Sequence, residues 1–452
     1  MAIECTDSPL SGLWRPQDHL KYLHYGSGCV ERHLLSVIPS PTSKVFIITG
    51  SSMATKTPAI RKLEELLGEL HAGTYSDIKQ HGQAEGVDEA TRLVNQDDKI
   101  DTVVSVGGGS PIDSAKMVCF RIHESRAGRT LTHIAIPTTL SAAECTAGGG
   151  FTRSDGTKLG FMHPSMGVGA IFYDASFARH TPKRLWLSTG MRAVDHAVET
   201  VYHPNACEVP WKALAQWALG VLVECLPAAD KIHGDDTADD ITTKLQLAAF
   251  ASSGLRGSNF RGGMGLSHSL GHALGSPYGI PRKFTISYYH TPRLTSIPSK
   301  RRANKAEPSS PETPLRHVQS DLQTACNNKP PRHKKIPGRK ITADQRAFPD
   351  GETSCLTLGP VLRHKAETDE AAAQQISRLL PALGGNRRGG GDARGEAIEV
   401  AQRVEALVRE LGLQQPSLSA RGVDRDQVAV IARRASGGEP SKEILALVES
   451  LF

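Results

Sequence analysis

The eight cysteines of this 452-residue sequence form no CxxC pair and no close cluster with histidine. Their scatter excludes a zinc ribbon and a disulfide-stapled scaffold, and it favours a reducing compartment. The N-terminal stretch has no basic flank followed by an apolar run, so we expect no secretory signal peptide. The most apolar stretch, residues 213–229, contains Gln216 and Glu224, which favours a buried helix over a membrane span. We therefore expect a cytoplasmic protein with no membrane partner.

A polyanion-binding protein is also not indicated, although the net charge is +6. Residues 282–350 hold 15 Lys and Arg against 5 Asp and Glu, so the rest of the chain carries a net charge of −4. This segment also holds 9 of the 27 prolines and has almost no periodicity, which predicts a disordered basic insertion. Nucleic-acid binding through the segment is an alternative, but no recognition fold accompanies the charge, and we expect no nucleic-acid partner.

Two kinds of pattern divide the chain. Apolar β-branched runs at 44–49, 101–106 and 131–136 alternate with helical patterns such as 59–70, which predicts a parallel, doubly wound sheet with ligands beyond its carboxyl ends. From about residue 185, apolar residues recur at helical spacing and strand signals become rare. We therefore predict an α/β nucleotide-binding domain over 1–182 and an all-α catalytic domain over 183–452, interrupted by the basic insertion.

A glycine-rich turn follows the second predicted strand, in the sequence VGGGSPIDSAK. It is neither a GxGxxG fingerprint nor a Walker loop. Ser110 is placed to cap the following helix and Pro111 to occupy its first position. Backbone N–H groups at such a helix start bind phosphate oxygens, although the turn alone is also compatible with a plain connection. The third predicted strand ends similarly in Thr138 and Thr139, whose hydroxyls would lie at the same edge of the sheet.

Histidines mark the helical part of the chain. His268 and His272 are four residues apart and so share one face of a helix, and His196 lies in another helical pattern. Converging histidines can bind a metal, donate a proton or contact a carboxylate. Taken alone, a pair at this spacing is more often structural.

Four motifs together, GGGSPIDSAK, IPTTLSAAE, STGMRAVDHAVE and GLSHSLGHALGSPYGIP, resemble the iron-containing alcohol dehydrogenase family, and specifically its maleylacetate reductase branch. The resemblance implies a dehydroquinate synthase-like fold, a homodimer, and an active site in a cleft between an N-terminal nicotinamide-nucleotide domain and a helical domain. It assigns NADH or NADPH to Gly107, Gly108, Gly109, Ser110, Asp113, Lys116, Thr138 and Thr139. It assigns the catalytic cleft to Arg192, His196, His268 and His272.

This sequence departs from the wider family at a position that binds the metal in metal-dependent members. Metal-dependent members resembling this chain carry Asp four residues before the His of their HAxE segment, and here that position is Arg192. A guanidinium cannot ligate a cation, so a catalytic iron or zinc is doubtful and the metal ligands stay unknown. Arg192 suits a dicarboxylate substrate instead, although a structural pairing with Asp195 or Glu199 is an equal alternative. Gly50 ends the first predicted strand where NAD-selective relatives place Asp, so NADPH is not excluded.

The basic segment separates two halves of one motif. The family continues its histidine motif as IPHGxTSCLTL, whereas this chain has Ile280, Pro281, Arg282, the segment, and then GETSCLTL from Gly351. Codons for Arg282 and the next two residues can contain an intron donor, and those for Pro349 and Asp350 an acceptor. Splicing there keeps the reading frame and creates the missing histidine. We hypothesise that residues 282–350 are a translated intron and that the working protein has 384 residues; a genuine loop is the alternative.

The function that we expect is NAD(P)H-dependent reduction of 2-maleylacetate to 3-oxoadipate in aromatic-compound degradation, with His272 or His268 as proton donor. A general alcohol or aldehyde oxidoreductase of the same family is one alternative. A nucleotide-binding form whose catalysis is impaired by the insertion is another.

Overall fold

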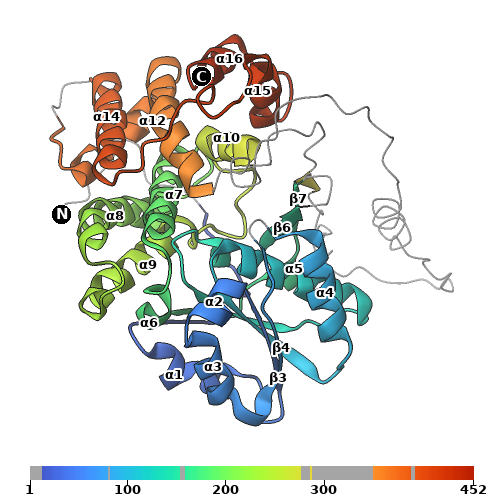
Figure 1. Ribbon diagram of the computed structural model, residues 1–452. Coiled ribbons are helices and arrows are strands. Elements are labelled where there is room, and N and C mark those ends of the chain that lie inside the picture. Colours follow the sequence, from blue (N-terminus) through green and yellow to red (C-terminus); the bar gives the residue numbers. More distant parts are fainter. Residues whose placement is uncertain (1–12, 80–81, 153–157, 276–285, 288–349, 388–391) are drawn as a thin grey trace, which may run out of the picture. The chain divides into compact units, whose positions relative to one another are not determined.

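The computed structural model describes residues 13–79, 82–152, 158–275, 286–287, 350–387 and 392–452 (Figure 1). The predicted disordered insertion, its interpretation as a translated intron, and the Pro281–Arg282 junction lie outside these residues, apart from 286–287 and 350.

The main sheet is parallel, as predicted, and has six strands, of which three were predicted. Their order across the sheet is β1 (Tyr22–Tyr25), β8 (Ala170–Tyr173), β5 (Thr132–Pro137), β4 (Ile100–Gly107), β2 (Lys44–Thr49) and β3 (His71–Tyr75). The three predicted strands are confirmed to within one residue at each end. The chain leaves β2 toward β3 but leaves β4 toward β5, in the opposite direction. The carboxyl ends of β2 and β4 therefore border the switch point of the sheet, where such folds bind ligands.

Helices cover both faces of this sheet because its strands are apolar on both sides. Val45 and Ile47 belong to a core beneath α1 (Cys29–His33) and α3 (Ala59–Leu67), whereas Phe46 and Ile48 belong to the core beneath α4 and α5. Figure 1 shows these two pairs of helices on opposite sides of the strands. The remaining helices of this part are α2 (Ser51–Lys56), α4 (Ala84–Asn95), α5 (Gly109–Ser125) and α6 (Ala175–Ala178).

A small second sheet follows β5. Its strands β6 (Gly148–Thr152) and β7 (Lys158–Met162) are antiparallel, and β9 (Ile286–Ser287) pairs in parallel with β7. The short β9 lies within the range 282–350.

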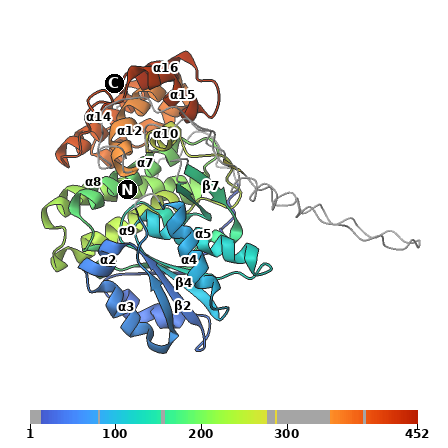
Figure 2. The same cartoon turned by 45° about the vertical axis from the view of Figure 1, so that its right-hand side comes forward.

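The helical part begins directly after Pro182 with α7 (Lys183–Tyr202), which is buried along nearly its whole length. Figure 2 shows α10 and α12 lying beside α7, in agreement with their packing contacts. The other helices are α8 (Ala213–Ile232), α9 (Asp239–Ser253), α10 (Leu266–Gly275), α12 (Asp350–Thr368), α13 (Glu370–Ser377), α14 (Ala393–Glu410), α15 (Val428–Ser436) and α16 (Lys442–Glu449).

One described stretch, Glu208–Ile232, passes the length and hydropathy test for a membrane-crossing helix. Its main helix, α8, packs against α7 and α9 and contributes Leu219, Leu222 and Leu226 to the helical core. Within the 18-residue window that passes the test, 39% is buried in the protein, so packing accounts for part of its apolar composition.

Candidate active site

The glycine turn lies at the switch point of the main sheet. β4 ends at Gly107, whose φ of +140° suits glycine, and α5 begins at Gly109 with Gly108 as its N-cap. Ser110 and Pro111 are therefore inside the first turn, so the predictions that Ser110 caps the helix and Pro111 opens it are wrong. The sharp turn at Gly107 starts the helix earlier. The first N–H groups of a 17-residue helix consequently face the carboxyl edge of the sheet, where an anion is stabilised.

The threonine loop after β5 lies against this turn. The Thr138 backbone N–H donates to the Gly107 carbonyl at 2.9 Å. A Cβ added to Gly108 would lie 2.9 Å from Thr139 Cγ2, so glycine is required for the two loops to touch. Thr138 and Thr139 are both buried, and Thr139 Oγ1 donates to Ser141 Oγ at 3.1 Å. The structure thus brings together the two loops predicted to bind the cofactor.

Asp113 and Lys116, also predicted to bind the cofactor, lie further along α5. Lys116 is fully buried, and its Nζ donates to the carbonyls of Ala143 and Gly148, the latter at 2.7 Å. The same ammonium lies 3.5 Å from the Asp113 carboxylate. These contacts give Lys116 a structural task, which is to hold the chain between Ala143 and Gly148 against α5.

Hydrogen bonds connect the threonine loop to the helical part of the chain. Thr181 Oγ1 donates to the Thr138 carbonyl at 2.6 Å, and the Leu140 N–H donates to Thr189 Oγ1 at 3.1 Å. Thr189 lies on α7 one turn before Arg192. Threonine hydroxyls at the start of the helical part therefore fix the backbone of the threonine loop to the predicted catalytic helix.

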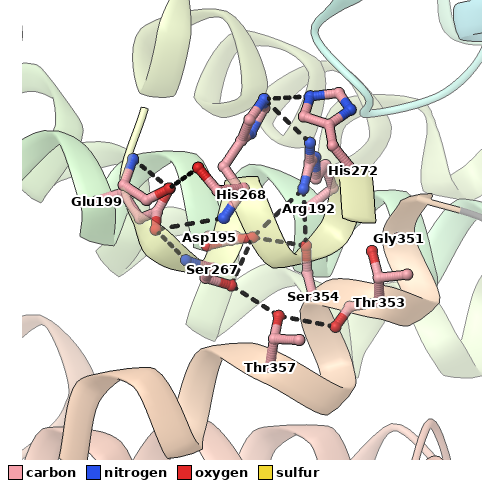
Figure 3. Close-up of polar contacts among 12 residues, drawn as sticks. Arg192, Asp195, Glu199, Ser267, His268, His272, Gly351, Thr353, Ser354 and Thr357 are labelled. Atoms are coloured by element: carbon pink, nitrogen blue, oxygen red, sulfur yellow. Dashed lines mark hydrogen bonds and ion pairs between the residues drawn. The ribbon is translucent and has the colours of Figure 1, made fainter. Parts of the chain in front are cut away.

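Arg192 is the centre of a buried polar cluster between α7, α10 and α12 (Figure 3). Its Nη1 donates to Ser354 Oγ at 3.3 Å and lies 3.5 Å from an oxygen of Asp195. Its Nη2 lies 3.4 Å from His268 Nε2. A Cβ on Gly271 would lie 3.1 Å from Nη1, so the close approach of the guanidinium to α10 depends on glycine there.

The three predicted histidines come together beside Arg192. The Nε2 atoms of His268 and His272 are 2.9 Å apart, and the ring centroids of His196 and His268 are 5.5 Å apart. Burial, followed by the charge of Arg192, lowers the pKa of His268 well below its usual range, so this ring is neutral.

Two nitrogen atoms approach His268 Nε2. Arg192 Nη2, which can only donate, lies 3.4 Å away, and His272 Nε2 lies 2.9 Å away. Among the described residues, His268 Nδ1 is buried without a hydrogen-bond partner. The two imidazole rings are therefore in direct hydrogen-bond contact beside the guanidinium.

Asp195 is a residue that the sequence offered only as a pairing partner for Arg192. It is fully buried and accepts from Ser354 Oγ at 2.6 Å and from Ser267 Oγ at 3.1 Å. Ser267 in turn contacts Thr357 Oγ1 at 2.8 Å. Burial raises the pKa of Asp195, while Arg192 and the two serines oppose this shift. These hydrogen bonds hold the Asp195 carboxylate in place, and Asp195 in turn pairs with Arg192.

Glu199 holds the start of the helix that carries the histidines. One of its carboxylate oxygens accepts from the Gly265 N–H at 2.9 Å and the other from the Ser267 N–H at 2.8 Å. Tyr202 OH also donates to it at 3.0 Å. Burial and the nearby Asp195 carboxylate raise the pKa of Glu199 to about 8. Glu199 therefore acts as a cap for α10, supplied by a different helix.

Sequence reasoning missed these supporting residues for different reasons. Glu199 was visible as the last residue of the HAVE segment, but its bonds to α10 depend on how the helices pack. Ser267, Ser354 and Thr357 carry no individual signal, since small hydroxyl residues are common in helices. Gly351 at the start of α12 is needed because a Cβ there would lie 2.3 Å from the Ser188 carbonyl oxygen of α7.

Comparisons with known proteins agree with this arrangement. Residues 21–175 match the profile of the family described as iron-containing alcohol dehydrogenase. Dehydrogenase FUM7 of Gibberella moniliformis is 30% identical over 277 residues, which cover 52% of this chain and 63% of the relative. Maleylacetate reductase 2 of Cupriavidus pinatubonensis is 29% identical over 261 residues, which cover 57% of this chain and 66% of the relative. The chain thus spans just under two thirds of the length of these two relatives.

A solved structure supports the fold across nearly the whole chain. Maleylacetate reductase from Agrobacterium tumefaciens superposes with a TM-score of 0.64 at 20% identity, covering 98% of both chains. The predicted fold, an α/β part with a parallel sheet followed by a helical part, is confirmed. The resemblance to the iron-containing alcohol dehydrogenase family is also confirmed, and it extends to the maleylacetate reductase branch. The chain thus resembles dehydrogenases and reductases.

Proposed function

We propose that this protein catalyses the NAD(P)H-dependent reduction of 2-maleylacetate to 3-oxoadipate. The observation that carries the proposal is the buried guanidinium of Arg192, which lies beside His268 at the position where metal-dependent relatives carry an acidic ligand. A fixed cation next to a proton donor suits a substrate with two carboxylates. The similarity to maleylacetate reductases supports the same substrate class.

The residues around Arg192 do not fit a catalytic iron or zinc. His268 Nε2, the nitrogen that would bind an ion, already faces Arg192 Nη2 at 3.4 Å. A divalent cation at that nitrogen would be repelled by the guanidinium. We therefore propose a reaction that involves no metal.

The two loops at the switch point fit a dinucleotide. Gly107, Gly108, Gly109 and Ser110 would hold its pyrophosphate through the backbone N–H groups of the turn and of α5, with Thr138 and Thr139 closing the same site. When bound, the reduced nicotinamide supplies the hydride for the reduction. Since Ser51 and Ser52 follow β2 where an acidic residue would repel a 2′-phosphate, we propose that both NADH and NADPH are accepted.

The side chains of this protein then account for the rest of the reaction. Arg192 binds a substrate carboxylate and orients the conjugated double bond. The substrate gains one hydride at one alkene carbon and one proton at the other, and the intervening enolate is stabilised by the same positive charge. His272, whose Nε2 contacts His268 Nε2, donates that proton.

The test is steady-state oxidation of NADH and NADPH by the purified chain with maleylacetate, with and without a metal chelator. We expect turnover that the chelator does not change. Turnover that the chelator abolishes would contradict the reaction without a metal, and no turnover with either form of the chain, 452 or 384 residues, would contradict the substrate.

A general alcohol or aldehyde oxidoreductase is the second candidate, because relatives such as Dehydrogenase FUM7 carry no named substrate and similar solved structures include 1,3-propanediol oxidoreductase. This function predicts oxidation of simple alcohols that depends on added iron or zinc. The same assay with alcohols and metal decides between the two. A cytoplasmic location and a homodimer stay predictions.

A further inference from the structure

A second group of potential metal ligands lies away from the candidate active site, on the α/β part of the chain. His123 and Glu124 are in the last turn of α5, and His163 follows β7 directly. One ligand atom from each of the three side chains lies within 4.8 Å of the others. Neither α7 nor α10, which carry the candidate catalytic residues, contributes to this group.

Both imidazole rings are oriented by hydroxyl groups. His163 Nδ1 contacts Ser165 Oγ at 2.7 Å, and His123 Nδ1 contacts Thr130 Oγ1 at 3.4 Å. The ring of Phe120 packs edge-on against His163, with centroids 5.2 Å apart. The Ser165 N–H also donates to His163 Nδ1 at 3.2 Å. Histidines that bind metals donate a hydrogen bond from their other ring nitrogen. Zinc at His163 Nε2 therefore places the ring proton on Nδ1, where Ser165 Oγ at 2.7 Å accepts it and the bond from the Ser165 N–H is lost. In His123, Nε2 is the ring nitrogen that does not contact Thr130.

The surroundings also suit a cation. The three groups meet at the carboxyl end of a 17-residue helix, where the last carbonyl groups carry partial negative charge. Both histidines are half-buried, whereas Glu124 is exposed and can rotate toward them. Zinc ligands at about 2.1 Å from the metal lie roughly 3.4 Å apart, so the three ligand atoms, which lie within 4.8 Å of one another, must move closer together on binding.

We propose that His123, Glu124 and His163 form a zinc site with two imidazole ligands, one carboxylate and a fourth position for water. This ligand set matches the nitrogen and oxygen preference of zinc. Because His163 directly follows β7, bound zinc ties the small sheet to the carboxyl end of α5, whose opposite end forms the anion site at Gly109. The site is independent of the proposed reaction.

The test is zinc binding by the full 452-residue chain after treatment with a chelator and dialysis. Calorimetric titration with Zn²⁺ should show one equivalent bound in the micromolar range or tighter. His163→Gln and His123→Gln should each weaken this equivalent by about ten-fold or more, as the loss of one ligand implies. His33→Gln, at an exposed histidine, is the matched control and should leave it unchanged.

A double variant separates this site from the active-site histidines. In His268→Gln/His272→Gln, the same equivalent should remain at unchanged affinity. The proposal is overturned if no zinc binds, if the equivalent is lost in the double variant, or if it persists in both single variants. Circular dichroism establishes that each variant is folded, and Co²⁺ in place of zinc should give the visible spectrum of a four-coordinate site only when His123 and His163 are present.

Discussion

At the scale of single residues, Arg192 is the side chain on which the substrate proposal depends. Its two terminal nitrogens contact different partners, Ser354 and His268, and these contacts involve two of the five N–H donors of the guanidinium. Arg192→Lys keeps the positive charge beside Asp195 but offers a single ammonium. Charge-assisted hydrogen bonds contribute about 1.5–3 kcal/mol, so we expect kcat/KM for maleylacetate to fall by about 10- to 100-fold.

The kinetics distinguish substrate binding from a damaged fold. The KM for the nicotinamide cofactor should stay within about two-fold of the unmodified chain, because the cofactor loops are not touched. Lys212→Arg, at a buried cation that directly precedes α8 and pairs with Glu208, is a control that should leave both constants unchanged. An Arg192→Lys chain with full activity would remove Arg192 from substrate binding.

His133 on β5 is a second residue with a testable effect, because its burial makes the free energy of unfolding depend on pH. It is fully buried, its Nε2 contacts Ser105 Oγ at 2.8 Å, and burial lowers its pKa from 6.5 to about 3. Below pH 6.5 the unfolded chain binds a proton at this ring and the folded chain does not, so stability is lost as pH falls toward 3.

The measurement is urea unfolding at about pH 7.5 and about pH 5. His133→Gln should lose less stability between these two values than the unmodified chain, by about 2 kcal/mol. His33→Gln removes an exposed histidine and serves as the control. Equal losses in the His133 variant and the unmodified chain would show that this ring is not kept neutral by burial.

At the scale of secondary-structure elements, the site depends on how α10 is held. Glu199 on α7 accepts from the N–H groups of Gly265 and Ser267 at the start of α10. Glu199→Gln puts an amide N–H₂ opposite one of these donors, which loosens the first turn and displaces His268. Caps contribute about 0.5–2 kcal/mol, so we expect kcat to fall by up to about 30-fold while cofactor affinity is kept.

The N-terminal cap of α14 provides the control for Glu199→Gln. Asp392 accepts from the Gly395 N–H at the start of α14, away from α7 and α10. Asp392→Ala should reduce the free energy of unfolding by a similar amount without changing kcat. If both variants change stability alone, Glu199 is a structural cap and not a positioning residue.

The second element that matters is the turn between β4 and α5. A Cβ at Gly108 would press on Thr139, which separates the two loops and blocks the approach of a pyrophosphate. Gly108→Ala should therefore weaken NADH binding by about ten-fold or more, as the loss of a charge-assisted contact implies. Gly220→Ala on α8 meets open space and should leave NADH binding unchanged in the same fluorescence titration.

At the scale of the whole molecule, the sequence predicts the sheet and the catalytic face but not the residues behind them. Strands with continuous apolar runs, such as β2 and β4, are predictable because both faces are buried. The edge strands β1 and β3 were missed, since their half-exposed residues give little pattern, and β8 was missed although it is buried, because its apolar run is only four residues long. His268 and His272 share a helical face by spacing alone, whereas the contacts of Ser354 with Asp195 and Arg192 join positions more than 150 residues apart, which no local pattern encodes.

That long-range contact bears on the form of the protein that is active. α10 and α12 belong to two halves of one motif, separated by residues 282–350, yet Ser267 and Thr357 from these two helices are 2.8 Å apart. The halves are already side by side, so replacing residues 282–350 with one histidine should leave the packing of α7, α10 and α12 intact.

We expect the resulting 384-residue form to bind NADH as the 452-residue chain does and to turn over maleylacetate at least about ten-fold faster, because the additional histidine completes the cleft. Parallel expression of both forms, with cofactor titration and steady-state kinetics, tests this. Equal turnover would mean that the segment is compatible with catalysis, and a 384-residue form that does not fold would mean that the segment is part of the native structure.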